Sequence, residues 1–156
     1  MSSYRHVYYH VVFHTKASNP TISNQHCESL YAFIWGIVKN KNSKLLQING
    51  TEDHLHLLLN IHPSHSVADM VKDIKVFSSV WIKKSNFFPQ FTGWAGGYGC
   101  FTVSYREKDQ LIGYIKKQKE HHKMQSFEDE LRTILSEHQI EIDDKVKDHL
   151  LDNLKV

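Results

Sequence analysis

The run Glu52-Asp53-His54-Leu55-His56-Leu57-Leu58-Leu59 constrains the fold of this chain more than any other segment. Eight residues dominated by leucine and bounded by polar groups are typical of a largely buried strand. Successive strand side chains point to opposite faces, so His54 and His56 share one face and the leucines at 55, 57 and 59 share the other. Two imidazoles on one face of a rigid strand can bind one cation. They can equally be core histidines that hydrogen-bond to neighbouring groups, and the pair alone leaves both interpretations open.

The segments around this run predict an order of strands and helices. A strand over 4–15 precedes a helix that begins near Ser23, and a short strand over 44–48 leads through a turn at Asn49-Gly50 into the histidine strand. A second helix, capped by Ser66, and a strand over 98–105 follow. The order β-α-β-β-α-β predicts an α+β, ferredoxin-like fold, in which an antiparallel sheet carries two helices on one face. Its first and third strands lie side by side in the centre.

Three helical patterns follow the last predicted strand. The first, from Asp109 to about Lys123, places Tyr114 and Gln118 on one face because they are four residues apart. Ser126 is expected to cap the next helix, and a weaker pattern covers 143–154. Since no linker divides the 156 residues, we expect one domain, with 126–156 as a helical extension of 1–125.

Composition narrows the class of protein only a little. The chain has no run of 18 apolar residues and no charged-then-apolar leader, so we expect neither a membrane span nor a secretory signal, and predict a cytoplasmic protein. The net charge of +2 suggests an acidic partner only weakly. Local basic groups, such as Lys116, Lys117 and Lys119, are candidate phosphate contacts, although solvated helix faces also explain them.

Three segments together resemble the single-tyrosine HUH transposases of the insertion-sequence 200/605 family. They are Asp53-His54-Leu55-His56-Leu57-Leu58, the glycine-rich stretch 93–104 and Tyr114-Ile115-Lys116-Lys117-Gln118, and the opening 9–16 is similar as well. The resemblance covers roughly 4–124 and makes 1–125 the catalytic domain, including the tyrosine helix. It implies that His54, His56 and Gln118 bind a divalent cation and that Tyr114 is the nucleophile.

The chemistry of these residue types agrees with those roles. A phenol with a pKa near 10 is a poor nucleophile at neutral pH unless it is helped. A cation with open positions can polarise a phosphate and stabilise the leaving oxygen. Two imidazoles and one amide oxygen suit Mg²⁺ or Mn²⁺, whereas a structural zinc site requires four closed ligands.

The resemblance implies a DNA transposase that cleaves and rejoins single-stranded DNA through a 5′-phosphotyrosine intermediate. It also implies a homodimer that recognises DNA hairpins near the element ends, often with the tyrosine helix completing the partner's site. Two alternatives stay open: a host-domesticated relative that processes chromosomal repeats, and a DNA-binding module without catalysis.

Two further expectations concern groups near the histidine strand. A zinc hydrolase fits less well, because no carboxylate lies near His54 and His56 at the spacing of a general base unless Asp53 or Glu52 bends inward. His121 and His122 fall on roughly the same face as Tyr114, and we expect solvent or DNA phosphate to be their partner.

Overall fold

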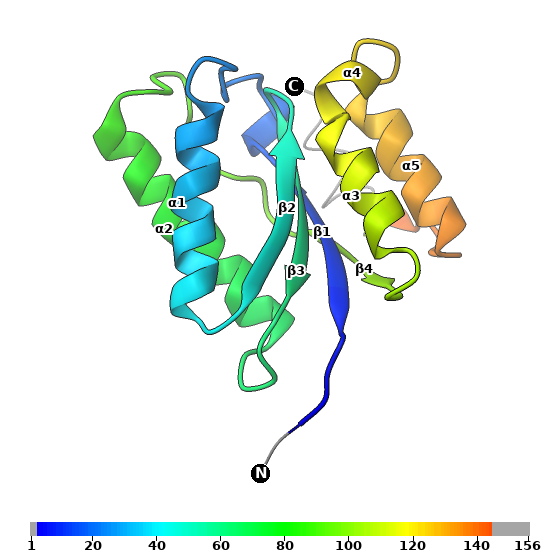
Figure 1. Ribbon diagram of the computed structural model, residues 1–156. Helices are drawn as coiled ribbons and strands as arrows, with labels where there is room; N and C mark the ends of the chain where they lie inside the picture. The colour runs from blue at the N-terminus through cyan, green and yellow to red at the C-terminus, as the bar shows by residue number, and fades with distance from the viewer. Residues whose placement is uncertain (1–2, 145–156) are drawn as a thin grey trace.

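A computed structural model describes residues 3–144 and contains the predicted α+β sheet. The strands β1 (Tyr8–His14), β2 (Lys44–Gly50), β3 (His54–Asn60) and β4 (Gly99–Val103) form one antiparallel sheet in the order β2-β3-β1-β4. This is the ferredoxin-like arrangement, and β1 and β3 are central as predicted (Figure 1). Each histidine of β3 is therefore supported by strands on both sides.

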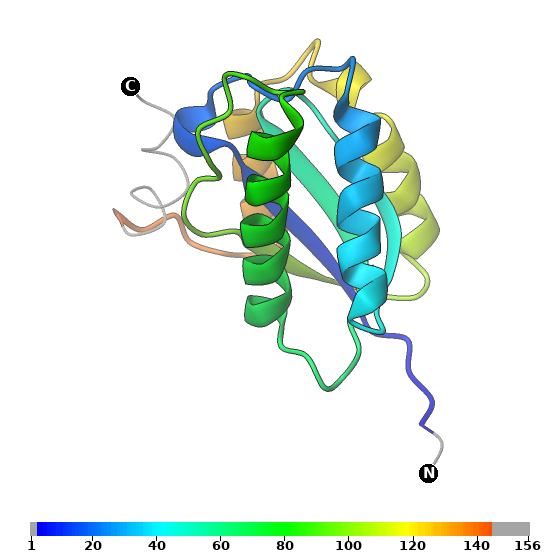
Figure 2. The same ribbon diagram turned by 90° about the vertical axis from the view of Figure 1, so that its left-hand side faces the viewer.

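Helices cover both faces of the sheet. The helices α1 (Cys27–Asn40) and α2 (Val67–Ser85) lie side by side on one face (Figure 2). On the other face lie α3 (Lys108–Lys116), α4 (Gln118–His121) and α5 (Phe127–Glu137) (Figure 1). A short 3₁₀ helix, η1 (Lys16–Ser18), follows β1. Within the described residues no helix combines the length and apolar character that crossing a membrane requires.

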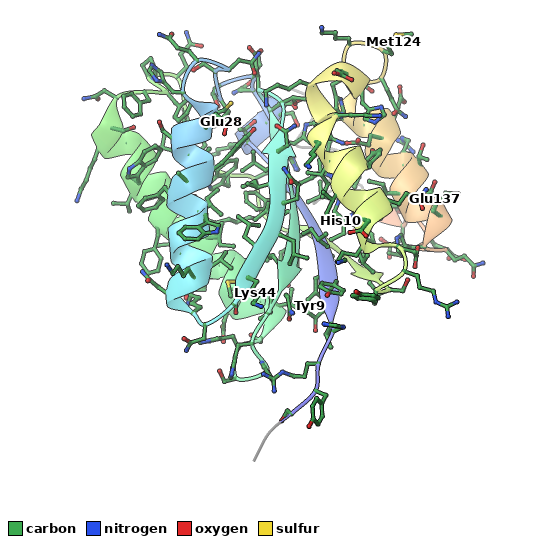
Figure 3. The ribbon with its side chains drawn as sticks, viewed as in Figure 1. Tyr9, His10, Glu28, Lys44, Met124 and Glu137 are labelled. Carbon is green, nitrogen blue, oxygen red and sulfur yellow. The ribbon has the colours of Figure 1, made fainter. Side chains whose placement is uncertain are left out.

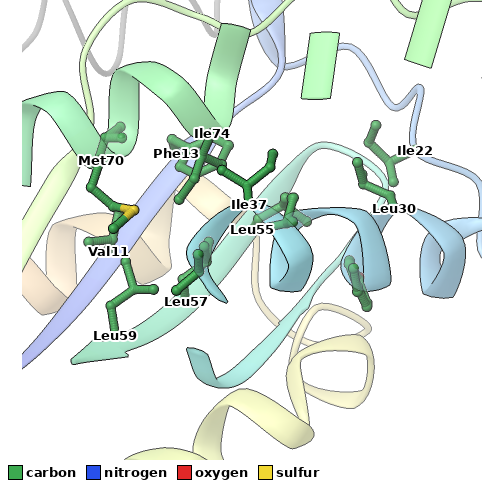
Figure 4. Packing of buried hydrophobic residues seen from close by; sticks show 14 of the residues in the cluster. Val11, Phe13, Ile22, Leu30, Ile37, Leu55, Leu57, Leu59, Met70 and Ile74 are labelled. Atoms are coloured by element: carbon green, nitrogen blue, oxygen red, sulfur yellow. The ribbon is translucent and has the colours of Figure 1, made fainter. Parts of the chain in front are cut away.

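The leucines of β3 determine which way its histidines point. Leu55, Leu57 and Leu59 are fully buried and pack with Val11 and Phe13 of β1 against α1 and α2 (Figure 4). Full burial of one such side chain is worth about 1.5–3 kcal/mol. A slip of one residue along β3 would expose this whole set to the opposite face. Packing on the α1–α2 side thereby directs His54 and His56 towards α3, α4 and α5.

Three local predictions were wrong in detail. The first helix begins at Cys27, not near Ser23, because the backbone at His26 is still non-helical. Asn49 and Gly50 end β2 instead of forming the turn, which spans 51–53 and is closed by a bond from the Thr51 amide to the His54 carbonyl. The predicted helix from Asp109 to Lys123 breaks at Lys117 into α3 and α4. Most of the helix expected over 143–154 lies outside the described residues.

Two glycines provide a matched test of this packing. A Cβ on Gly50 would lie 2.0 Å from the His54 carbonyl oxygen, whereas a Cβ on Gly36, within α1, would meet nothing within 4 Å. We predict that Gly50→Ala lowers the free energy of unfolding by about 1–3 kcal/mol through steric crowding. Gly36→Ala should raise it by about 0.5–1 kcal/mol, because alanine is the better helix former. Urea denaturation of both variants measures the difference, and equal stabilities would contradict the observed strand ending.

Candidate active site

Two buried histidines form the floor of the candidate site. His54 and His56 have no exposed surface and lie on the sheet face covered by α3, α4 and α5. The register places His14 opposite His54 and Val12 opposite His56, so β1 contributes side chains to the same face. His10 of β1 lies on this side as well (Figure 3).

A hydrogen bond at Nδ1 fixes the orientation of each imidazole. His54 Nδ1 lies 2.7 Å from Asp53 Oδ1 and 2.9 Å from Thr51 Oγ1. His56 Nδ1 lies 2.8 Å from His10 Nε2. Both Nε2 atoms are then directed away from the strand towards one point, as in metal sites where a second group orients each ligating histidine.

The tyrosine helix adds two of the predicted residues to this point. Gln118 is fully buried, and its Oε1 lies 3.2 Å from His54 Nε2. The Tyr114 ring is 6.0 Å from the ring of His56, centroid to centroid. Although the helix breaks between them at Lys117, Tyr114 and Gln118 still face the same group, because both contact the side chain of Glu130. The structure thus brings together all four residues that the sequence singled out.

Glu130 of α5 lies at the centre of the site and was not predicted. Its Oε1 lies 2.8 Å from His56 Nε2, 3.0 Å from His122 Nε2 and 3.3 Å from His54 Nε2. Its Oε2 accepts hydrogen bonds from Gln118 Nε2, at 2.9 Å, and from the Tyr114 hydroxyl.

The sequence did contain a signal for Glu130. It falls at helical spacing within the apolar stripe formed by Phe127, Leu131 and Ile134, and it is 1% exposed. A carboxylate on the buried face of an amphipathic helix must find partners. The pattern therefore indicated a buried acidic group, but it gave no indication of which groups it would meet.

The electrostatics of the site follow from burial and these contacts. Burial lowers the pKa of His56 to about 4 and that of His10 to about 3, which leaves both imidazoles neutral. Burial acts in the same direction on His54, but hydrogen bonds to Asp53 and Glu130 outweigh it and raise its pKa. The pKa of Glu130 is held well below its usual range by His122, His54 and His56, against the effect of burial. Burial and the contact with Glu130 raise the pKa of Tyr114.

Two expectations about neighbouring groups require correction. His122 does not face solvent or phosphate, because its Nε2 contacts Glu130, whereas His121 packs on the Tyr114 ring with 4.9 Å between centroids. The expectation that no carboxylate lies beside His54 and His56 was also wrong. Glu130 of α5 places a carboxylate at the Nε2 atoms of both, and Asp53 contacts His54 at Nδ1.

The basic residues of this region differ in their surroundings. Lys116 and Lys117 are exposed at the end of α3. The Lys119 ammonium is partly buried and donates to Asn49 Oδ1 at 2.7 Å and to the Gly50 carbonyl at 3.1 Å. Its contacts tie α4 to the end of β2.

The donor set fits a divalent cation. One ligand atom from each of His54, His56, His122 and Glu130 lies within 4.8 Å of the others. A divalent cation at this point would offset the charge of the buried carboxylate. Gln118 Oε1 adds an oxygen on the same side. A cleft of about 420 Å³ between α3 and α5 reaches the site and is lined in part by Tyr114, Glu130, His10 and His121.

Comparison with known proteins identifies the family. The family described as "Transposase IS200 like" matches residues 3–118, which include His54, His56, Tyr114 and Gln118. The chain belongs to the IS200-like transposases. The match ends at Gln118, so His122 and Glu130 of this IS200-like transposase lie beyond it.

Relatives and solved structures agree with this assignment. The transposase for insertion sequence element IS200 of Salmonella typhimurium is 27% identical over 121 residues, covering 74% of this chain and 79% of the relative. ISDra2 transposase TnpA of Deinococcus radiodurans is 24% identical, with 70% and 82% covered. A crystal structure described as a transposase from Deinococcus radiodurans R1 aligns with a TM-score of 0.58 and 26% identity, over 76% of this chain and 95% of that one.

A further structure shares the fold alone. It is a REP-associated tyrosine transposase bound to a REP hairpin, with a TM-score of 0.59 and 12% identity, covering 78% of this chain and 74% of that chain.

The hydrogen bond at His54 Nδ1 leads to a prediction about metal affinity. Replacing Asp53 by alanine removes the carboxylate that orients His54, so Mn²⁺ binding should weaken by about 10- to 100-fold. Glu52→Ala is the matched control, because Glu52 is exposed and one residue away. Isothermal titration of the metal-free protein with Mn²⁺ measures both affinities. Equal affinities in the two variants would show that Asp53 does not act on the site.

Proposed function

We propose that this IS200-like transposase cleaves and rejoins single-stranded DNA by transesterification at Tyr114. One observation supports this proposal above all: the Tyr114 hydroxyl and the Nε2 atoms of His54 and His56 contact the same carboxylate. Attack on a phosphodiester requires a nucleophile close to a group that activates the phosphate. Here the hydroxyl and the candidate metal ligands contact the two oxygens of one carboxylate.

In the proposed reaction the Tyr114 oxygen forms a bond to phosphorus. The bond from phosphorus to the 3′-oxygen of the preceding nucleotide breaks, which gives a 5′-phosphotyrosine and a free 3′-hydroxyl. The phenol loses one proton and the leaving oxygen gains one. A 3′-hydroxyl can later attack the phosphotyrosine and rejoin DNA without a high-energy cofactor.

The surrounding residues supply position and protection. His54, His56 and Gln118 are proposed to hold Mg²⁺ or Mn²⁺, which would polarise the scissile phosphate and stabilise the leaving oxygen. Asp53 and His10 keep the two imidazoles oriented. Burial and the contact with Glu130 raise the pKa of Tyr114, so its hydroxyl is protonated in the free protein.

DNA contacts are proposed for the basic end of the tyrosine helix. The exposed Lys116 and Lys117 are free to reach phosphates, which would make binding weaker as salt is added. Lys119 is proposed for the same surface, but its bonds to Asn49 and Gly50 restrict it to a contact beside β2.

The resemblance also supports two proposals about assembly. One is recognition of hairpins near the element ends, in keeping with the REP hairpin bound by the structural neighbour. The other is a homodimer. Since Tyr114 contacts Glu130 of its own chain, we propose that one chain can assemble the site in cis.

Formation of a covalent DNA adduct tests the proposed function. Incubation with single-stranded element ends and Mn²⁺ should yield a protein–DNA adduct, and mass spectrometry should locate the nucleotide on Tyr114. Tyr114→Phe should abolish the adduct because it removes the attacking oxygen. Tyr105→Phe is the matched control, since Tyr105 is 57% exposed and lies outside the site. An adduct that survives Tyr114→Phe would exclude Tyr114 as the nucleophile.

A further inference from the structure

We infer that Glu130 and His122 are additional ligands of the divalent cation, and that Glu130 joins the cation to the nucleophile by holding the Tyr114 hydroxyl through its second oxygen. The inference deepens the proposed function and rests on its metal site. Both residues lie beyond the part of the chain that matches the family, which ends at Gln118.

Four possible ligand atoms converge at one point of the site. Glu130 Oε1 lies between 2.8 and 3.3 Å from the Nε2 atoms of His54, His56 and His122. Ligands of a tetrahedral ion with bonds of about 2.0–2.2 Å stand roughly 3.3–3.6 Å apart. The distances from Glu130 Oε1 are therefore near the lower end of the spacing in a coordination shell, and all four atoms lie within 4.8 Å of one another. Small adjustments of the side chains would admit the ion.

The two carboxylate oxygens of Glu130 contact different groups. Oε1 faces the imidazoles, whereas Oε2 accepts from the Tyr114 hydroxyl and from Gln118 Nε2 at 2.9 Å. The same Gln118 directs its Oε1 towards His54 Nε2, 3.2 Å away. If Oε1 binds the cation, Oε2 holds the phenol oxygen close to that cation, on the other oxygen of the same carboxylate. Tyr114 would then be positioned by the same residue that binds the ion.

Burial of the Glu130 carboxylate costs desolvation free energy that a purely structural role would not require. Its carboxylate is 1% exposed and sits in the apolar stripe of α5, next to Phe127 and Leu131. An apolar residue at this position would pack α5 on the sheet without desolvating a charge. A buried carboxylate facing three imidazoles is instead the arrangement of a metal ligand.

This ligand set also determines the preferred ion. Three imidazole nitrogens and one carboxylate suit later first-row ions such as Co²⁺ and Zn²⁺ better than Mg²⁺, which prefers oxygen ligands and retains water. We therefore expect Co²⁺ to bind more tightly than Mg²⁺, and use it as the probe because its visible spectrum reports the number and type of its ligands.

The experiment compares Co²⁺ binding to the full chain and to three variants, by titration calorimetry and visible absorption, without DNA. Glu130→Gln keeps the shape of the side chain and removes its charge, and His122→Asn removes the imidazole. Glu128→Gln is the matched control, with the same chemical change on the same helix at a residue whose partner is the surface Arg132. Circular dichroism of each metal-free variant verifies that the fold is retained.

Glu130→Gln and His122→Asn are each expected to weaken Co²⁺ binding at least about tenfold and to alter the absorption spectrum, while Glu128→Gln leaves both unchanged. Unchanged or tighter binding in Glu130→Gln would overturn the inference, since Glu130 would then be only a partner of the imidazoles. If either variant fails to fold, the Co²⁺ spectrum of the wild-type chain decides the question. A spectrum typical of water-rich coordination, in place of one typical of four ligands, would also overturn the inference. If the wild-type chain binds Co²⁺ through these ligands but forms no DNA adduct, the proposed function fails and this inference stands.

Discussion

The buried carboxylate of Glu130 is the interaction on which the site-bearing face of this protein depends. It joins β3, α3, α4 and α5 through His56, Tyr114, Gln118 and its own helix. An ionised group with almost no exposure is stable only where several partners surround it, and removing one partner of a buried charge typically costs about 3–5 kcal/mol. The position of α5 is therefore tied to the position of the histidines, and Tyr114 is held beside them by the same carboxylate.

The two faces of the sheet have different roles: one carries the hydrophobic core and the other carries the candidate site. On one, the leucines of β3 and the apolar residues of β1 pack against α1 and α2 and set the register. On the other, the same register places His54 and His56 beneath α3 and α5. A hydrogen bond from His54 Nδ1 to the Asp53 carboxylate, and one between His56 Nδ1 and His10 Nε2, then fix the direction of each imidazole. A rigid hydrophobic layer thus provides the precision that a catalytic site requires.

Local patterns were sufficient to predict much of this arrangement. Alternation in the leucine strand predicted which face His54 and His56 occupy, and the spacing of Tyr114 and Gln118 predicted that they meet despite the helix break at Lys117. Glu130 could not be assigned to the site, because a pattern within α5 shows burial but not which residues 74 positions earlier it faces. His122 was misplaced for the same reason: its direction depends on the packing of α4 against α5, which periodicity does not contain.

The most direct test of the central claim is the position of a bound ion. In crystals grown with Mn²⁺, anomalous scattering should place one ion about 2.0–2.3 Å from the Nε2 atoms of both His54 and His56, on the side that faces the Tyr114 hydroxyl. An ion bound elsewhere, or reached through only one of the two imidazoles, would contradict the account that these histidines and Tyr114 form a single site.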